Sequence, residues 1–178
     1  MKLFVVSDIH GSKYYAEKIK EIYHREKPDK IILLGDLYYH GPRNPLTKEY
    51  NPMEVSQILN SLKDNILCVR GNCDAEVDEM ISDFHFEDSI RLDIGGKKFF
   101  FTHGHKYNMD NIPADVDVLI YGHFHTGFIK EKDGVLCINA GSITLPKENT
   151  PNSYLIINDS EIILMDIDNH VIDKVNYL

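Results

Sequence analysis

The chain is poor in cysteine, poor in basic residues and free of long apolar runs, and each shortage excludes a class of protein. Its three cysteines, Cys68, Cys73 and Cys137, are odd in number and widely spaced, so they form neither a disulfide framework nor a zinc-knuckle pattern. With 19 Lys and Arg against 28 Asp and Glu, the net charge is -9, which argues against duplex nucleic acid held on a broad basic face. We therefore expect a protein of the reducing cytoplasm that binds no duplex nucleic acid.

The lack of long apolar runs also argues against a membrane protein. No run approaches the roughly 18 apolar residues that a membrane helix needs, and the apolar start of the chain reaches Asp8 too soon for a signal peptide. The remaining composition, 43% hydrophobic and 26% charged, is typical of a globular fold. The length of 178 residues suits one domain with a sizeable core, and no linker or repeat divides it. We expect a single domain over residues 1–178.

The first half of the chain alternates apolar runs with helical spacing, which is the pattern of βαβ units. Apolar runs predict three short buried strands there, at 3–6, 30–34 and 66–69. Ser12 is the expected N-cap of a helix that ends near Glu26, and Pro52 is the expected first residue of a second helix that ends near Lys63. A short third helix is expected to open at Cys73 or Asp74. Strands connected through helices become parallel neighbours.

The second half of the chain carries alternating apolar and polar residues with hairpin turns. Gly95-Gly96 and Asp133-Gly134 lie between such segments and predict two hairpins. The strands expected in this half lie at 90–94, 97–101, 117–121, 128–132, 135–138, 154–157, 162–167 and 171–175. Two sheets packed face to face, with helices outside, accommodate a βα-rich half followed by a hairpin-rich half.

Five of the predicted strands end in side chains that bind metals. The residues at these ends are Asp8 with His10, Asp36, Asn72, His103, and His123 with His125. One such end is commonly a capped turn, but five independent turns have no reason to select His and Asp so consistently. Imidazole and carboxylate without thiolate suit divalent manganese, iron or zinc. Seven candidate ligands are too many for one tetrahedral ion and enough for two ions that share a bridging carboxylate.

A two-ion site would be locally positive within an acidic chain. Two divalent ions outweigh two aspartates and a bridging hydroxide by about one positive charge. Such a cluster attracts a small anion, and a pair of ions suits in-line attack at phosphorus. These properties favour a small phosphorylated substrate.

At the same positions, the sequence resembles the motif series of the calcineurin-like metallophosphoesterases. The matching segments follow the family's order from residue 1 to about 145: Asp8-x-His10, Gly35-Asp36, Gly71-Asn72, His103 and Gly122-His123-x-His125. Three further segments resemble the compact bacterial and archaeal phosphodiesterase branch, the YfcE type: His40-Gly41-Pro42-Arg43-Asn44, Arg70-Gly71-Asn72-Cys73-Asp74 and Thr102-His103-Gly104-His105.

The resemblance implies an α/β fold with a dinuclear metal centre. The implied architecture is a four-layer α/β/β/α sandwich of two mixed sheets flanked by helices. The implied ligand sets are Asp8, His10 and His125 for one metal, Asn72, His103 and His123 for the other, and Asp36 as the bridge. Manganese is the expected metal, with iron, zinc, nickel and cobalt as alternatives. The implied activity is hydrolysis of a small phosphodiester by a hydroxide that bridges the metals, and small members of the family often form dimers, so a homodimer or higher homo-oligomer is expected.

Four residues are expected to act in the reaction, namely Asp36, Asn72, Cys73 and His105. Many family members have His where this chain has Cys73, and a thiol is the weaker donor at neutral pH. We therefore expect little phosphomonoesterase activity on alkyl phosphates, with a packing role for Cys73 as the alternative. His105 either contacts phosphate or faces solvent. Arg43 either clamps a phosphate oxygen or forms a surface salt bridge.

Two other functions stay open on the sequence alone. One is a protein-interaction scaffold of the same fold that has lost the chemistry, as in the retromer subunit, but the presence of Asp36 and Asn72 argues against it. The other is an enzyme for phosphomonoesters or for dinucleotide polyphosphates. Comparison of a diester with its matching monoester would identify the latter.

Overall fold

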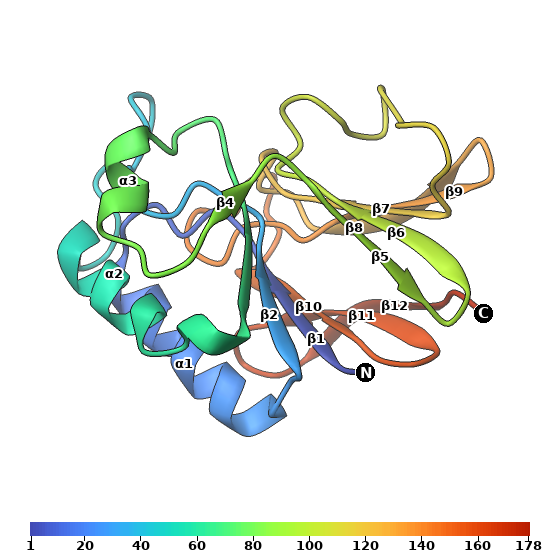
Figure 1. The fold of residues 1–178 in the computed structure, drawn as a ribbon, viewed down its shortest axis with the longest axis horizontal. Helices are drawn as coiled ribbons and strands as arrows, with labels where there is room; N and C mark the ends of the chain where they lie inside the picture. Colours follow the sequence, from blue (N-terminus) through green and yellow to red (C-terminus); the bar gives the residue numbers. More distant parts are fainter.

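Two β-sheets packed face to face form the centre of the molecule (Figure 1). The computed structural model describes all residues from 1 to 178. The first sheet has seven strands in the order β12-β11-β10-β1-β2-β3-β4, and the second has five in the order β5-β6-β7-β9-β8. The strands of the first sheet are β1 (Leu3–Val6), β2 (Lys30–Leu33), β3 (Ile66–Val69), β4 (Phe86–Glu87), β10 (Ser153–Ile157), β11 (Glu161–Asp166) and β12 (Val171–Asn176). Those of the second are β5 (Ile90–Ile94), β6 (Lys97–Phe101), β7 (Val118–Tyr121), β8 (Phe128–Lys132) and β9 (Val135–Asn139).

Parallel pairing places the carboxyl ends of neighbouring strands at one edge of each sheet. β1 pairs in parallel with β2, and β2 with β3, so that Val6 lies opposite Leu33 and Leu33 opposite Cys68. In the second sheet, β6, β7 and β9 are parallel. The predicted βαβ arrangement is thereby confirmed, as are the two predicted hairpins, which are the antiparallel pairs β5–β6 and β8–β9.

The helices all lie on one side of the molecule, against the first sheet (Figure 1). They are α1 (Lys13–Glu26), α2 (Pro52–Asn60), a single 3-10 turn (Lys63–Asn65) and α3 (Glu76–Met80). Ser12 caps α1 as predicted, because its hydroxyl oxygen accepts the N–H of Tyr15 at 3.4 Å. No helix in the structure combines the length and the apolar character that are needed to cross a membrane.

Three local predictions need correction. The helix from Pro52 ends at Asn60 rather than near Lys63, because the chain tightens into the 3-10 turn. α3 begins at Glu76 and not at Cys73 or Asp74. The two-residue strand β4 pairs with β3 and was not predicted, since so short a segment has no alternation of its own.

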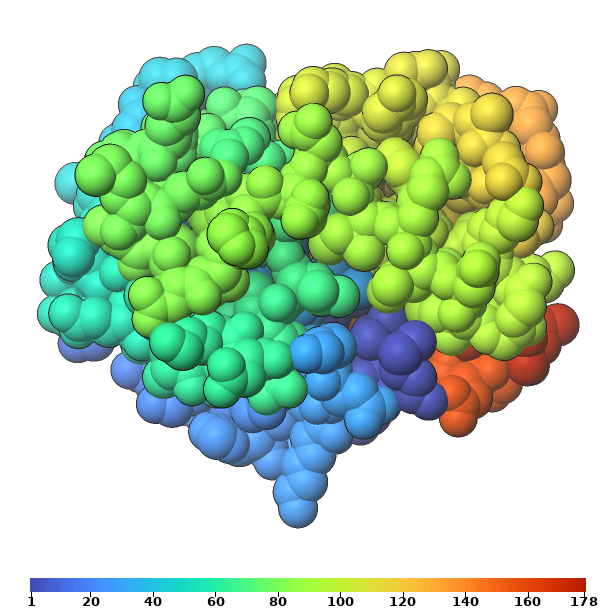
Figure 2. All heavy atoms as spheres, in the orientation of Figure 1, coloured from blue at the N-terminus to red at the C-terminus, as the bar shows by residue number.

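β1 is buried on both faces because it lies between the helical layer and the second sheet. Phe4 packs with Ile19 of α1 in one core cluster, whereas Val5 belongs to a second cluster with Phe99 of β6. Burial on both faces explains why this strand is a continuous apolar run without alternation. Figure 2 shows the N-terminal residues, in dark blue, beside the orange and red C-terminal strands, in line with the antiparallel pairing of β1 with β10.

The outer face of the second sheet is covered by a loop, which connects β6 to β7 and appears in yellow in Figure 1. Met109, Ile112 and Val116 of this loop pack on Phe100 and Tyr121. The two mixed sheets are as predicted, but helices flank only the first of them. The fourth layer of the sandwich is therefore this loop and not a helix.

Candidate metal centre

The polar residues singled out in the sequence lie together at the carboxyl ends of parallel strands from both sheets. Asp8 and His10 follow β1, Asp36 follows β2, Asn72 follows β3, His103 follows β6, and His123 and His125 follow β7. A direct hydrogen bond joins the two sheets here, since the backbone N–H of His123 donates to Asp8 Oδ2 at 2.9 Å. The other oxygen of Asp8 is left to face the centre.

Five of these residues have a left-handed backbone conformation. The φ angle is 58° at Asp8, 50° at His10, 56° at Asp36, 66° at His123 and 61° at His125. A non-glycine residue in this region costs about 1–3 kcal/mol and persists only where the surrounding structure enforces it. The sharp turn after each strand thus aims the side chain inward with a loss of local stability.

Asp8, His10 and His125 form the first group of ligand atoms. Nε2 of His125 lies 3.1 Å from Asp8 Oδ1 and 3.3 Å from Nε2 of His10. His10 Nε2 is 3.5 Å from the same carboxylate oxygen, and all three side chains are buried. One carboxylate oxygen and two imidazole nitrogens at this spacing are a suitable ligand set for a divalent cation.

Asn72, His103 and His123 form the second group. Nε2 of His103 lies 2.9 Å from Asn72 Oδ1 and 3.2 Å from Nδ1 of His123. One oxygen of Asp36 faces both groups, because its Oδ2 is 3.4 Å from His103 Nε2 and 3.7 Å from His10 Nε2. Asp36 therefore lies where a carboxylate shared by two cations would lie.

Backbone carbonyl groups fix the tautomer of three of these histidines. Nδ1 of His10, His103 and His125 each lies 2.7 Å from a carbonyl oxygen, of Tyr39, Leu34 and Leu145 respectively. A carbonyl can only accept, so each Nδ1 carries the hydrogen and donates it. In the neutral ring Nε2 is then a free acceptor, which is the state that binds a metal.

The contacts between acceptors show that divalent cations fit this centre. Nε2 of His10 and Nε2 of His125 face each other with no hydrogen to share when both rings are neutral. Asp8 Oδ1 is fully buried and has no hydrogen-bond partner. Buried acceptors without donors are rare in proteins, because their desolvation is then uncompensated. A cation among these atoms would satisfy all of them.

Charges within the centre shift the pKa values of its side chains in opposite directions. Burial disfavours a charged His103 ring, but the carboxylates of Asp36 and Asp8 outweigh burial and raise its pKa to about 9. Burial and the adjacent His103 lower the pKa of His123 to about 4. Although burial opposes ionisation of Asp8 and Asp36, their histidine neighbours lower the pKa of both carboxyl groups. The centre thus keeps both carboxylate charges, which attract cations.

Asp74 holds two of the ligand-bearing loops together, a role that the sequence did not reveal. Its carboxylate accepts the backbone N–H groups of Asp36 at 2.8 Å, Leu37 at 2.9 Å and Gly71 at 2.7 Å. Burial and the charge of Asp36 raise the pKa of Asp74 to about 6. In the sequence, Asp74 follows a strand end and closes the segment Arg70-Gly71-Asn72-Cys73-Asp74, but the only structural role predicted for it was the start of a helix.

A cavity of about 370 Å³ opens beside the centre. Its lining residues are His10, Asp36, Gly41, Pro42, Arg43, Asn44, Asn72, Cys73, His123, His125 and Lys147. The backbone N–H of Cys73 donates to Asp36 Oδ1 at 2.8 Å, and burial together with Asp36 raises the pKa of the thiol to about 12. Arg43 lines the cavity and forms no salt bridge, so its surface-pair alternative is absent from the structure. The exposed His105 lies beside His103 but does not line the cavity.

Comparison with known proteins identifies one family. Residues 1–161 match the calcineurin-like phosphoesterase superfamily domain. The chain is 38% identical over 159 residues to phosphodiesterase YfcE of Escherichia coli strain K12, covering 86% of this chain and 85% of that protein. It is 31% identical over 151 residues to phosphodiesterase MJ0936 of Methanocaldococcus jannaschii, covering 79% of this chain and 83% of that protein. The solved structure of the E. coli phosphoesterase YfcE covers both chains completely, with a TM-score of 0.96 at 34% identity. This chain therefore belongs to the calcineurin-like phosphoesterase superfamily.

Proposed function

We propose that this chain is a metal-dependent phosphodiesterase that hydrolyses a small phosphodiester at a dinuclear centre. The observation that carries the proposal is the position of Asp36 Oδ2, which faces His10 at 3.7 Å and His103 at 3.4 Å and so lies between two groups of ligand atoms. The names of the relatives YfcE and MJ0936, both phosphodiesterases, support the reaction class.

In this proposal each group of ligand atoms would hold one cation, and Asp36 would be shared between them. The ligands are Asp8, His10 and His125 for one cation and Asn72, His103 and His123 for the other. When bound, a pair of divalent ions polarises the phosphoryl oxygens and lowers the pKa of a water molecule to generate a nucleophile. Manganese is the first candidate, and the donor set accepts iron, zinc, nickel or cobalt, because imidazole and oxygen ligands without thiolate do not discriminate sharply among them.

The protein's own residues fix the geometry before substrate arrives. The carbonyl groups of Tyr39, Leu34 and Leu145 orient three imidazole rings, and the backbone N–H of Cys73 orients Asp36. Such outer contacts keep the ligand atoms in place and limit reorganisation during the reaction.

Cys73 limits how basic a leaving group the enzyme can expel. Its thiol lines the cavity and, with a pKa of about 12, stays protonated at neutral pH. A thiol is a weak hydrogen-bond donor, so it gives little help to a basic alkoxide. We therefore propose that diesters with acidic leaving groups react well and that alkyl phosphomonoesters react poorly.

The test is hydrolysis of bis-p-nitrophenyl phosphate by chelator-stripped protein, with and without added manganese. The proposal predicts activity only with metal, and a higher rate than on p-nitrophenyl phosphate. Metal analysis of the same samples provides the control. A folded protein that holds its metal and cleaves neither ester would refute the proposal and favour the scaffold function.

A further inference from the structure

Two cations line the cavity beside the metal centre and have no ion-pair partner. They are Arg43 and Lys147, and neither side chain forms a salt bridge or a hydrogen bond in the structure. Asp36 is the one carboxylate among the eleven lining residues, and a single lining residue is hydrophobic. The cavity wall therefore carries a net positive charge in a chain whose net charge is -9.

The backbone of Lys147 is anchored to the centre while its side chain is free. Its N–H donates to the carbonyl oxygen of His125 at 3.0 Å, and its own carbonyl oxygen accepts the hydroxyl of Thr150 at 2.7 Å. The side chain is exposed to solvent. The fixed backbone keeps Lys147 next to His125, one of the proposed ligand residues, and both residues line the cavity.

Arg43 is brought to the same cavity by a different loop. Asn44 closes this loop, since its Nδ2 donates to the carbonyl oxygen of His40 at 2.8 Å and its backbone N–H donates to that of Gly41 at 3.3 Å. Gly41 has a φ of 84°, and a Cβ at this position would lie 3.8 Å from Sγ of Cys73. The loop therefore packs close to Cys73 and brings the exposed Arg43 to the wall of the cavity.

The positive charge of the proposed centre and of the cavity wall together exceeds the negative charge of a simple phosphodiester. A phosphodiester carries one negative charge, which the cations of the proposed centre already face. Two further cations that lack any partner in the protein create a potential that attracts additional negative charge. An arginine and a lysine together suit the tetrahedral oxygens of a phosphate group, through paired and single hydrogen bonds.

We propose that Arg43 and Lys147 bind a second phosphate group of the substrate, so that the preferred substrate is a phosphodiester that carries a further phosphate monoester. This inference rests on the proposed phosphodiesterase function and narrows its substrate class. The volume of about 370 Å³ lies within the range of pockets for small molecules, which leaves room for a second phosphate group.

Two matched substrates test the proposal. They are the p-nitrophenyl ester of thymidine 5′-phosphate and the same ester with an added 3′-phosphate, which share the scissile bond and the leaving group. We expect kcat/KM in the manganese-loaded protein to be roughly 10-fold higher for the 3′-phosphorylated ester, since a hydrogen bond to a charged group contributes this much or more. Substitution of Arg43→Ala or Lys147→Ala should bring the ratio of the two values towards one, and added salt should reduce it.

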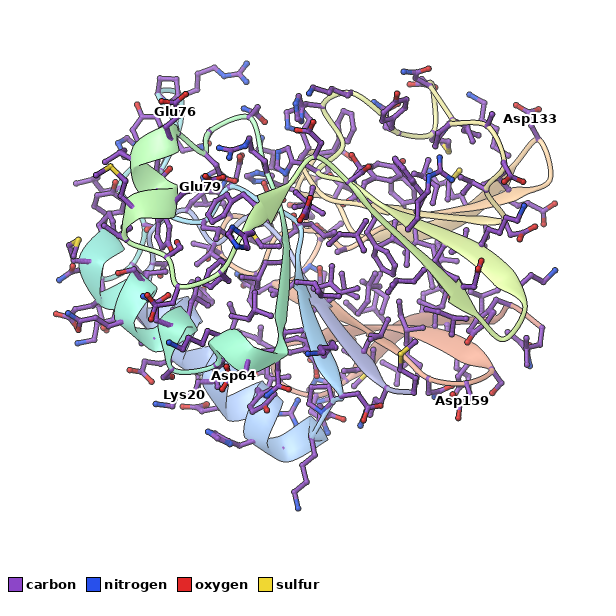
Figure 3. All side chains as sticks on the ribbon, viewed as in Figure 1. Lys20, Asp64, Glu76, Glu79, Asp133 and Asp159 are labelled. Carbon is purple, nitrogen blue, oxygen red and sulfur yellow. The ribbon has the colours of Figure 1, made fainter.

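Lys20 provides the matched control for the loss of one positive charge. Figure 3 labels this residue on α1, and Lys20 does not line the cavity. Lys20→Ala should keep the wild-type ratio, and Lys147→Arg should preserve most of it. A wild-type ratio near one would overturn the proposal. So would an equal fall of kcat/KM for both esters in the variants, because the cations would then contact the scissile phosphate.

A binding measurement separates this proposal from the proposed function. Calorimetric titration compares thymidine 3′,5′-bisphosphate with thymidine 5′-monophosphate on the manganese-loaded protein. Tighter binding of the bisphosphate that disappears in Arg43→Ala and Lys147→Ala supports the proposal even if neither ester is hydrolysed. Equal affinity for both nucleotides refutes it even if both esters are cleaved.

Discussion

Asp74 and Asp36 are joined through the backbone, because the carboxylate of Asp74 accepts the N–H of Asp36 at 2.8 Å. The same carboxylate binds the N–H groups of Leu37 and Gly71, and so ties the loop after β2 to the loop after β3. We predict that Asp74→Ala lowers the free energy of unfolding by about 2 kcal/mol or more, since it leaves several N–H groups without acceptors. Metal affinity should fall as well, as measured by calorimetric titration with manganese.

Asp64 provides the control for the loss of one carboxylate. It is the middle residue of the 3-10 turn and is labelled in Figure 3; it is exposed, and its carboxylate forms no hydrogen bond. Asp64→Ala should leave both the melting temperature and the manganese affinity close to those of the wild type. If Asp74→Ala behaved in the same way, the tie between the two loops would have no energetic importance.

The pKa of His103 predicts two opposite pH dependences. The stability of the metal-free protein should fall as the pH rises, whereas the affinity for metal should increase. The pKa of His103 is about 9 in the folded, metal-free protein, raised above its ordinary value of about 6.5 by Asp36 and Asp8 against the effect of burial. This stabilisation is fully present below about pH 6.5 and is lost as the pH rises through about 9. The melting temperature in chelator should therefore fall over this range.

Metal binding requires the neutral ring, so it must displace this proton. Because one proton is displaced, each unit of acidification below about pH 9 should weaken the affinity for manganese by up to about 10-fold. The rise in melting temperature on addition of manganese should consequently grow between pH 6.5 and pH 8.5. A thermal-shift series checks this, and His103→Gln should flatten the dependence. A manganese effect that is constant with pH would contradict the assignment of His103.

Asp36→Asn should abolish most of the hydrolysis of bis-p-nitrophenyl phosphate. The asparagine oxygen can still accept the N–H of Cys73, which lies 2.8 Å from Asp36 Oδ1, but the amide carries no charge between the two histidine groups. We expect kcat to fall by roughly 100-fold or more, together with the bound metal per chain. A variant that lost its metals and kept a near-wild-type rate would disprove the dinuclear proposal.

Cys73→His should shift the enzyme towards monoesters. The thiol has a pKa of about 12 and donates only weakly, whereas an imidazole at the wall of the cavity is a stronger donor to a departing alkoxide. The ratio of the rate on p-nitrophenyl phosphate to that on the diester should rise several-fold, which is less than the roughly 100-fold that a well-positioned acid contributes at the low end. Cys73→Ala is the control, and it should not raise this ratio.

The sequence was sufficient to predict where strands end and which side chains follow them. Asp8 and Asp36 could be placed at one edge because a βαβ unit makes β1 and β2 parallel, and hydrophobic periodicity is sufficient to detect such a unit. The left-handed backbone at Asp8 and Asp36 could not be predicted, because Asp adopts this conformation only in a minority of cases and the fold as a whole enforces it here.

Tertiary contacts also decide the roles that the sequence did not reveal. Asp74 resembles a helix cap locally, yet its partners come from the loop after β2. Lys147 carries no motif, and only the path of the chain after β9 brings it to the cavity. The location in the cytoplasm and the homo-oligomeric state stay predictions.

The hydrogen bond from His123 N–H to Asp8 Oδ2 has a consequence for the order of folding. It joins the first turn after β1 to the turn after β7, so the two halves of the centre come from segments that are far apart in the chain and lie in different sheets. Contacts between such distant segments form only after long loops have closed, which is slow. We therefore expect the proposed centre to be completed late in folding, after both sheets have docked. Ions bound in the proposed centre would then hold the two sheets together and would slow the unfolding of either one.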